Sequence, residues 1–105
     1  MRAKAIGFLD KDISGVQQPI FEKKIRDTAK CRHLDLARTL APGPEVDNPI
    51  QRLLNAIRRL DAAAVITPRL AHLGGCENVV IAQYEVIESE TGTVWRRGQF
   101  TTGTP

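Results

Sequence analysis

Residues 64–75 read AVITPRLAHLGG. The first residues of this stretch, Ala64, Val65 and Ile66, are all apolar. Such a run is typical of a central parallel strand that is covered on both faces. We predict that strand over residues 62–66, followed by a loop that runs through Leu73 to the Gly74-Gly75 pair. Because polar groups gather at the carboxyl ends of such strands, this loop is a candidate functional site.

Strand and helix patterns alternate on both sides of this stretch. Short apolar runs predict further strands over residues 3–9, 34–40, 84–88 and 93–97. In the second of these, Leu34, Leu36, Arg38 and Leu40 alternate with the residues between them. Residues 13–15 are expected to form a loop.

Three helices are predicted between the strands. One begins near Pro19, carries an apolar stripe that includes Ile20, and ends near Cys31, and a short one covers residues 77–83. The clearest helix signal lies after residue 48. Asp47 or Asn48 can cap this helix, and Pro49 suits its first turn. Apolar residues there repeat at the spacing of one helix face: Ile50, Leu53, Leu54, Ile57 and Leu60.

This alternation predicts an α/β fold, a small three-layer sandwich with a mostly parallel sheet of four or five strands. We expect a single domain over residues 1–98 and a flexible tail over residues 99–105.

Composition excludes several classes of protein. The chain has 105 residues, a net charge of +3 and 42% hydrophobic residues, with no apolar run of membrane-spanning length. We therefore expect no membrane contact and, without an export signal, a cytoplasmic location. Cys31, Cys76, His33 and His72 form no ligand pattern, so we expect neither a metal nor a cofactor.

Polar residues follow the first and third predicted strands, where they would share one edge of the sheet. They are Asp10, Asp12, Ser14, Arg69 and His72. Such a set is a candidate for binding a phosphorylated ligand or a metal ion. The alternative is that Asp10 and Asp12 are solvated turn residues, one of them a cap, and that His72 is a loop residue without a partner.

Basic residues concentrate on the first predicted helix and near the C-terminus. Lys23, Lys24 and Lys30, with Arg96 and Arg97, are candidates for contact with nucleic acid. The simpler interpretation is a solvated helix face, because Lys23 and Asp27 have the spacing of an ion pair.

The order of these motifs resembles the catalytic domain of the serine recombinases, the resolvases and invertases. The resemblance covers residues 3–75 and rests on residues 5–8 (AIGF), on Asn48-Pro49 with its helix, and on residues 70–75 (LAHLGG). It implies a resolvase-like fold.

The residues that perform the family's chemistry are replaced. The resemblance places a family arginine at Asp10 and the nucleophilic serine at Asp12. Three further arginines fall on Asn48, His72 and Gly75. An attack on a phosphodiester needs guanidinium groups to stabilise the charge that develops, so we expect no catalytic residues and no enzyme activity. Ser14 is an alternative nucleophile, which the sequence does little to support.

Aromatic residues gather in the C-terminal part of the chain. Tyr84, Trp95 and Phe100 are candidates for an interface, since a parallel sheet ends in edge strands that invite partners. The alternative is that Trp95 closes the protein's own core.

These observations favour a catalytically inactive recombinase-like domain that binds a protein partner or a second copy of itself. One alternative is a nucleic-acid-associated protein that uses the basic first helix. The other is a protein that binds a phosphorylated ligand or a metal at the strand ends.

Overall fold

The computed structural model describes residues 3–98, which form an α/β fold around a five-stranded sheet of order β2-β1-β3-β4-β5. The first four strands are parallel, and β5 pairs antiparallel with β4. In chain order the elements are β1 (Lys4–Phe8), α1 (Lys11–Ser14), α2 (Gln18–Cys31), β2 (Asp35–Leu40), α3 (Pro49–Leu60), β3 (Ala64–Thr67), α4 (Glu77–Ile81), β4 (Glu85–Glu88) and β5 (Val94–Trp95). The predicted fold class is confirmed.

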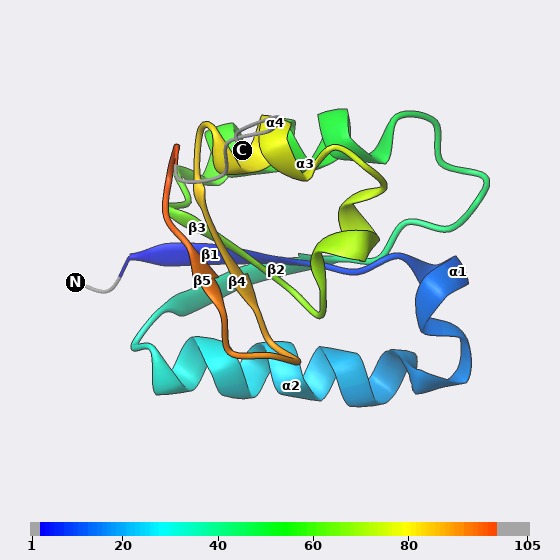
Figure 1. Ribbon diagram of the computed structural model, residues 1–105, viewed down its shortest axis with the longest axis horizontal. Helices are drawn as coiled ribbons and strands as arrows, with labels where there is room; N and C mark the ends of the chain where they lie inside the picture. The colour runs from blue at the N-terminus through cyan, green and yellow to red at the C-terminus, as the bar shows by residue number, and fades with distance from the viewer. Residues whose placement is uncertain (1–2, 99–105) are drawn as a thin grey trace, which may run out of the picture.

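The sheet lies between two helical layers, with α2 on one face and α3 and α4 on the other (Figure 1). Successive side chains of β1 alternate between these layers, as strand geometry requires. Ile6 and Phe8 pack in the core under α3, whereas Ala5 and Leu9 pack in the core under α2. Each face of the sheet therefore has its own apolar core.

Helix α3 forms because its apolar residues share one face. Leu53, Leu54 and Ile57 are buried on that face, and the predicted stripe is confirmed. Asn48 caps the helix through its side-chain oxygen, and Asp61 ends it in the left-handed conformation, with φ of 54°.

Helix α2 packs closely on β1 because residue 7 is glycine. A Cβ atom at Gly7 would lie 2.8 Å from a methyl group of Ile25 and 2.9 Å from the hydroxyl of Thr39. Ile25 and Ala29 are buried under this helix, but Ile20 is 56% exposed. The prediction that Ile20 belongs to the apolar stripe of α2 is therefore wrong.

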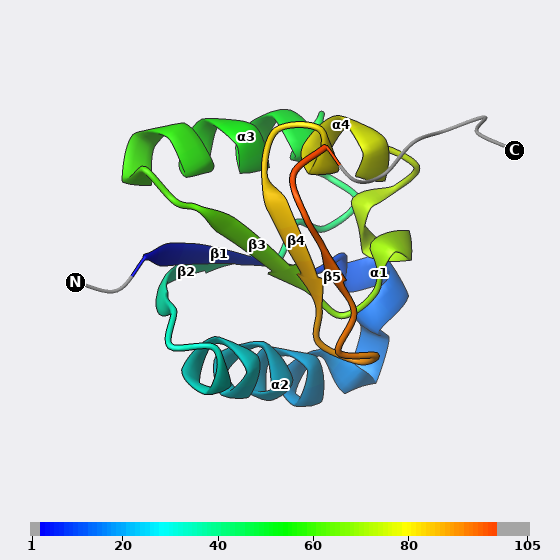
Figure 2. The same cartoon turned by 60° about the vertical axis from the view of Figure 1, so that its left-hand side comes forward.

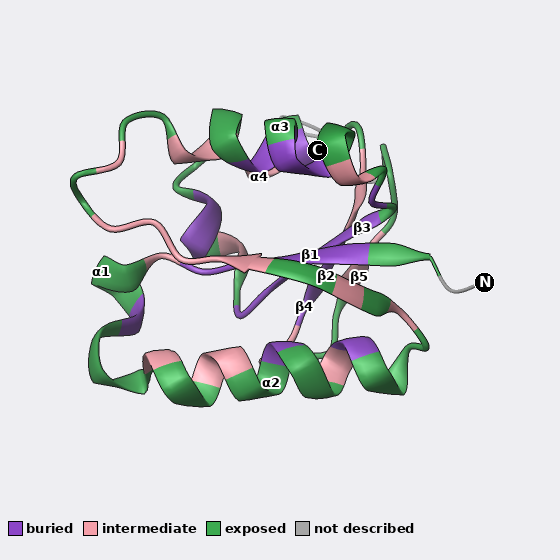
Figure 3. Cartoon of the chain, turned by 180° about the vertical axis from the view of Figure 1, so that it is seen from behind, coloured by how far each residue is buried: buried purple, intermediate pink, exposed green. Residues whose placement is uncertain are grey.

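Strand β2 forms one edge of the sheet and contains an irregularity that the alternating pattern does not reveal. Its pairing with β1 passes from Leu36 directly to Arg38, so Ala37 is an extra residue, a β-bulge. Leu36 packs with the α2 core and Leu40 with the α3 core. The alternating residues of 34–40 therefore do not all lie on one face of the sheet. No residue of β2 is buried, and Figure 3 shows the strand in the colours of exposed and intermediate residues.

Smaller differences occur where the chain turns. Residues 13–15 are not a simple loop, because Ile13 and Ser14 complete α1 and Gly15 starts a 3₁₀ turn. Strand β5 has only two residues, and α4 ends at Ile81. Within residues 3–98, no helix has the length and apolar character needed to cross a membrane. The predicted tail, with Phe100, lies outside the described residues.

Candidate functional site

The carboxyl ends of β1 and β3 are joined by a hydrogen bond between Asp10 and His72. The backbone N–H of Asp10 donates to Nδ1 of His72 at 2.9 Å. His72 lies on a 3₁₀ helix, Leu70–Leu73, that follows β3, and Figure 2 shows this turn at the same end of the sheet as α1. The structure thus brings two predicted site residues together.

His72 is a buried residue with defined partners, so the expectation of a loop residue without a partner is wrong. Its side chain is 4% exposed, and its ring meets the ring of Phe21 edge to face at a centroid distance of 5.6 Å. Burial lowers the pKa of His72 below its ordinary value of 6.5, while the carboxylates of Asp10 and Glu90 act in the opposite direction. A neutral imidazole is therefore favoured.

Asp10 itself caps α1. Its carboxylate accepts the backbone N–H of Asp12 at 2.8 Å, which is the local cap that the sequence offered as the alternative. Asp12 and Arg69 are exposed. In the described part of the chain, no three histidine, cysteine, aspartate or glutamate side chains lie close enough to share a metal ion.

Ser14 is buried at the end of α1, with 4% of its surface exposed. Its hydroxyl oxygen has no hydrogen-bond partner among residues 3–98. A serine nucleophile needs a base within hydrogen-bond distance, and neither His72 nor Asp12 occupies that position. The structure therefore does not join Ser14 to the predicted strand-end set.

Glu88, at the end of β4, was not among the sequence candidates. Its carboxylate accepts the backbone N–H of Leu70 at 3.0 Å, the indole N–H of Trp95 at 3.1 Å and the hydroxyl of Thr91 at 3.4 Å. A glutamate that ends an apolar strand is a signal for such a buried acceptor. Glu88 holds the turn after β3 and the last strand in place.

Two of the candidate nucleic-acid residues on α2 are ion-paired. Lys23 Nζ lies 2.8 Å from a carboxylate oxygen of Asp27, as its spacing predicts. Lys24 Nζ lies 3.1 Å from a carboxylate oxygen of Glu90. Lys30 is exposed in the last turn of the helix, where a cation is favoured by the helix dipole.

The C-terminal candidates separate into two groups. Tyr84, Arg96 and Arg97 line one pocket at the amino end of β3, together with Ala62, Ala63, Gln83 and Glu85. Trp95 is half-buried, packs with Tyr84 against the α3 core and donates its indole N–H to Glu88. Trp95 therefore contributes to the protein's own core.

A groove between β2 and α3 gathers arginine residues that the sequence candidates did not include. It has a volume of about 410 Å³ and is lined by Arg38, Leu40, Arg52, Asn55, Ala56 and Arg59. In residues 3–98, the guanidinium groups of these arginines make no hydrogen bond or ion pair with a protein group. We call this feature the arginine groove.

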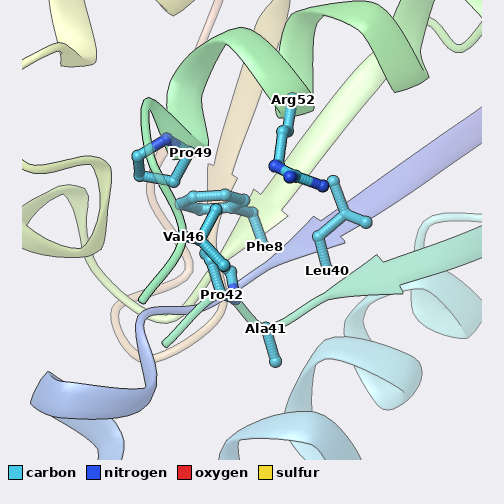
Figure 4. Close-up of a pocket in the computed structure, with 7 residues that line it drawn as sticks. All are labelled: Phe8, Leu40, Ala41, Pro42, Val46, Pro49 and Arg52. Atoms are coloured by element: carbon cyan, nitrogen blue, oxygen red, sulfur yellow. The ribbon is translucent and has the colours of Figure 1, made fainter. Parts of the chain in front are cut away.

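An apolar pocket of about 170 Å³ continues the arginine groove at the carboxyl end of β2. Its lining residues are Phe8, Leu40, Ala41, Pro42, Val46, Pro49 and Arg52, so that Leu40 and Arg52 belong to both features. In Figure 4 the Phe8 ring lies among Pro42, Val46 and Pro49, and the Arg52 side chain extends toward Leu40. We call it the strand-end pocket.

A signal for the arginine groove was present in the sequence. Arg52, Asn55 and Arg59 follow the spacing i, i+3, i+7, which places them on one flank of α3 beside its apolar face. The contribution of Arg38 could not be predicted, because it depends on the bulge at Ala37.

The chain was also compared with known proteins. No protein-family model, curated protein or solved structure matches it. The resemblance to the serine recombinases therefore stays a prediction.

Proposed function

We propose that this chain is a binding domain without catalytic activity, and that its partner is a protein. The observation that carries the proposal is that the polar groups at the strand ends form hydrogen bonds within the protein itself. Asp10, His72 and Glu88 each hold one part of the chain to another, so their polar atoms serve the fold.

Electrostatics at the strand ends also support an inactive site. A phosphoryl group needs positive charge around it, whereas this edge brings the carboxylates of Asp10 and Asp12 beside the cations of Lys11 and Arg69. Three arginines without a protein partner in residues 3–98, namely Arg38, Arg52 and Arg59, line the arginine groove between β2 and α3.

We also propose that the domain descends from a serine recombinase catalytic domain. The resemblance places family arginines at residues 10 and 72. In this chain those two positions carry Asp10 and His72, and the backbone N–H of Asp10 donates a hydrogen bond to Nδ1 of His72. An arginine at residue 72 has no acceptor for this N–H, so the contact fits a site converted from catalysis to structure.

The proposal is tested by incubating the chain with supercoiled plasmid and Mg²⁺. We expect neither nicking nor a covalent protein–DNA adduct, for the wild-type chain and for Ser14→Ala alike. Nicking or an adduct that the wild-type chain produces and Ser14→Ala abolishes would show that the chain is an enzyme.

A further inference from the structure

We propose that the arginine groove and the free edge of β2 together bind an extended acidic peptide of a partner protein. The peptide adds a strand to the sheet, places acidic side chains against the arginines and inserts one apolar side chain into the strand-end pocket. This inference rests on the proposed protein-binding function and names the chemistry and the place of the partner.

The edge of β2 supplies the main-chain contacts. In the described residues β2 pairs with β1 on one side and with no strand on the other. An edge strand presents unpaired N–H and C=O groups to its free side, and an added strand would lie about 4.8 Å away. Beyond the bulge at Ala37, residues 38–40 pair regularly with β1, so this segment offers the regular edge.

The flank of α3 forms the wall of the arginine groove opposite β2, beside the path of the added strand. Arg52 and Arg59 are seven residues apart on the helix, which corresponds to about 10 Å. Alternate side chains of a strand next to β2 would point toward α3 and so into the arginine groove, about 7 Å apart. Arginine side chains are long enough to cover the difference of about 3 Å between these two spacings, so acidic side chains at alternate positions can reach both Arg52 and Arg59.

The positive charge of the arginine groove favours an acidic partner. The lining of the arginine groove contains three guanidinium groups and no carboxylate, and none of the three has a protein partner in residues 3–98. Guanidinium groups bind carboxylates through paired hydrogen bonds, which gives both affinity and direction.

The strand-end pocket adds a site for one apolar side chain. It is lined mainly by apolar residues, and it shares Leu40 and Arg52 with the arginine groove. A peptide that runs along β2 therefore reaches the pocket at the carboxyl end of the strand. Side-chain pockets beside a shared strand edge are the usual source of specificity in this kind of peptide binding.

A peptide fits these features better than a nucleic acid does. The phosphate backbone offers acceptors only, whereas the free edge of β2 presents donors and acceptors. Single-stranded nucleic acids are also held by stacking on exposed aromatic rings. The large apolar side chains exposed in residues 3–98 are aliphatic: Ile13, Val16, Ile20 and Val79.

The first experiment selects peptides from a displayed library of random linear decamers on the full chain. We expect enrichment of sequences with Asp or Glu at alternating positions and an apolar residue near one end. Arg52→Ala/Arg59→Ala should lose this enrichment, whereas Arg58→Ala should keep it. Arg58 is the matched control because it is exposed in the same last turn of α3 but does not line the groove.

Binding of the most enriched peptide is then measured by fluorescence anisotropy. We expect Arg38→Ala, Arg52→Ala and Arg59→Ala each to weaken binding roughly threefold to tenfold, and Arg58→Ala to leave it unchanged. Thermal unfolding of each variant confirms that it folds. Two results would overturn the proposal. One is enrichment of peptides without acidic residues, and the other is a peptide that binds the double variant Arg52→Ala/Arg59→Ala as tightly as it binds the wild-type chain.

N-methylation of the peptide tests strand addition. Only alternate peptide N–H groups would face β2, so methylating that set should abolish binding and methylating the other set should not. Equal effects of the two sets would overturn strand addition. A labelled oligothymidylate that binds more tightly than the peptide, with the same dependence on Arg52 and Arg59, would identify the groove as a nucleic-acid site and overturn the peptide.

The experiments distinguish a failure of the proposed inactive binding domain from a failure of the proposed peptide site. Plasmid nicking would refute the inactive binding domain and leave a peptide result at the groove in place. Loss of the peptide result would refute the groove assignment and leave the inactive strand-end site in place.

Discussion

The imidazole of His72 accepts a hydrogen bond from the backbone N–H of Asp10 across 62 residues of sequence. Nδ1 can accept a hydrogen bond only when it carries no proton, so the contact requires a neutral ring with its proton on Nε2. Burial favours the same state, because it lowers the pKa of His72. One protonation state therefore links the segment after β1 to the segment after β3.

His72 should make stability depend on pH. Its pKa is lowered in the folded state, so below pH of about 6.5 the unfolded chain binds a proton that the folded chain does not. We expect the free energy of unfolding, measured with urea, to decrease as the pH falls from 7 to 5. His72→Asn keeps an acceptor for the Asp10 N–H without titrating and should flatten this dependence. His33→Asn, at the exposed second histidine of the described residues, is the matched control variant.

Gly7→Ala should destabilise the fold by about 1–3 kcal/mol, because the added methyl group would crowd Ile25 and Thr39. Denaturant unfolding measures the loss. Thr39→Ala removes one of the two contacts, so the double variant should lose less than the sum of the single variants. Additive losses would show that the added methyl group does not clash with Thr39.

Glu88→Gln should destabilise the fold by about 1–3 kcal/mol, because an amide replaces one of the oxygens that accept from Leu70 and Trp95. The tryptophan fluorescence should shift to longer wavelength because the hydrogen bond between the Trp95 indole and residue 88 is weakened. Glu85→Gln, at the start of the same strand, is the control and should change neither property. An unchanged Trp95 emission in Glu88→Gln would contradict the role assigned to Glu88.

Asp61→Gly should stabilise the chain by roughly 0.5–1 kcal/mol. Asp61 ends α3 with φ of 54°, where glycine has no Cβ penalty, and its carboxylate stands at the unfavourable end of the helix dipole. Thermal unfolding measures the gain. Asp61→Asn removes the charge alone and should give a smaller increase, so an equal increase would assign the whole effect to charge.

The layers of the fold could be predicted because they follow from local periodicity. The stripe that includes Leu53 and Ile57 predicts α3, and the unbroken apolar run around Val65 predicts a central strand. These patterns reflect burial on one face or on both, and each is visible within a few residues of sequence.

The candidate site could be predicted only in part, because it depends on contacts between distant segments. Asp10 and His72 were expected at one edge, but neither the hydrogen bond between them nor the contact of His72 with Phe21 could be read from the sequence. The groove could not be assembled from sequence, since Arg38 and Arg52 approach each other only after the bulge turns Arg38 toward α3.

The extra residue at Ala37 also limits how this protein can associate with itself. Open sheet edges allow identical chains to add strand upon strand, the geometry of fibrils. Here the bulge interrupts the edge of β2 after Leu36, and the charge of Arg38 follows directly. Two copies that aligned their β2 strands would lose register within a few residues and would bring like charges together. A bulged, charged edge of this kind favours the addition of one short segment over the repeated addition of identical strands.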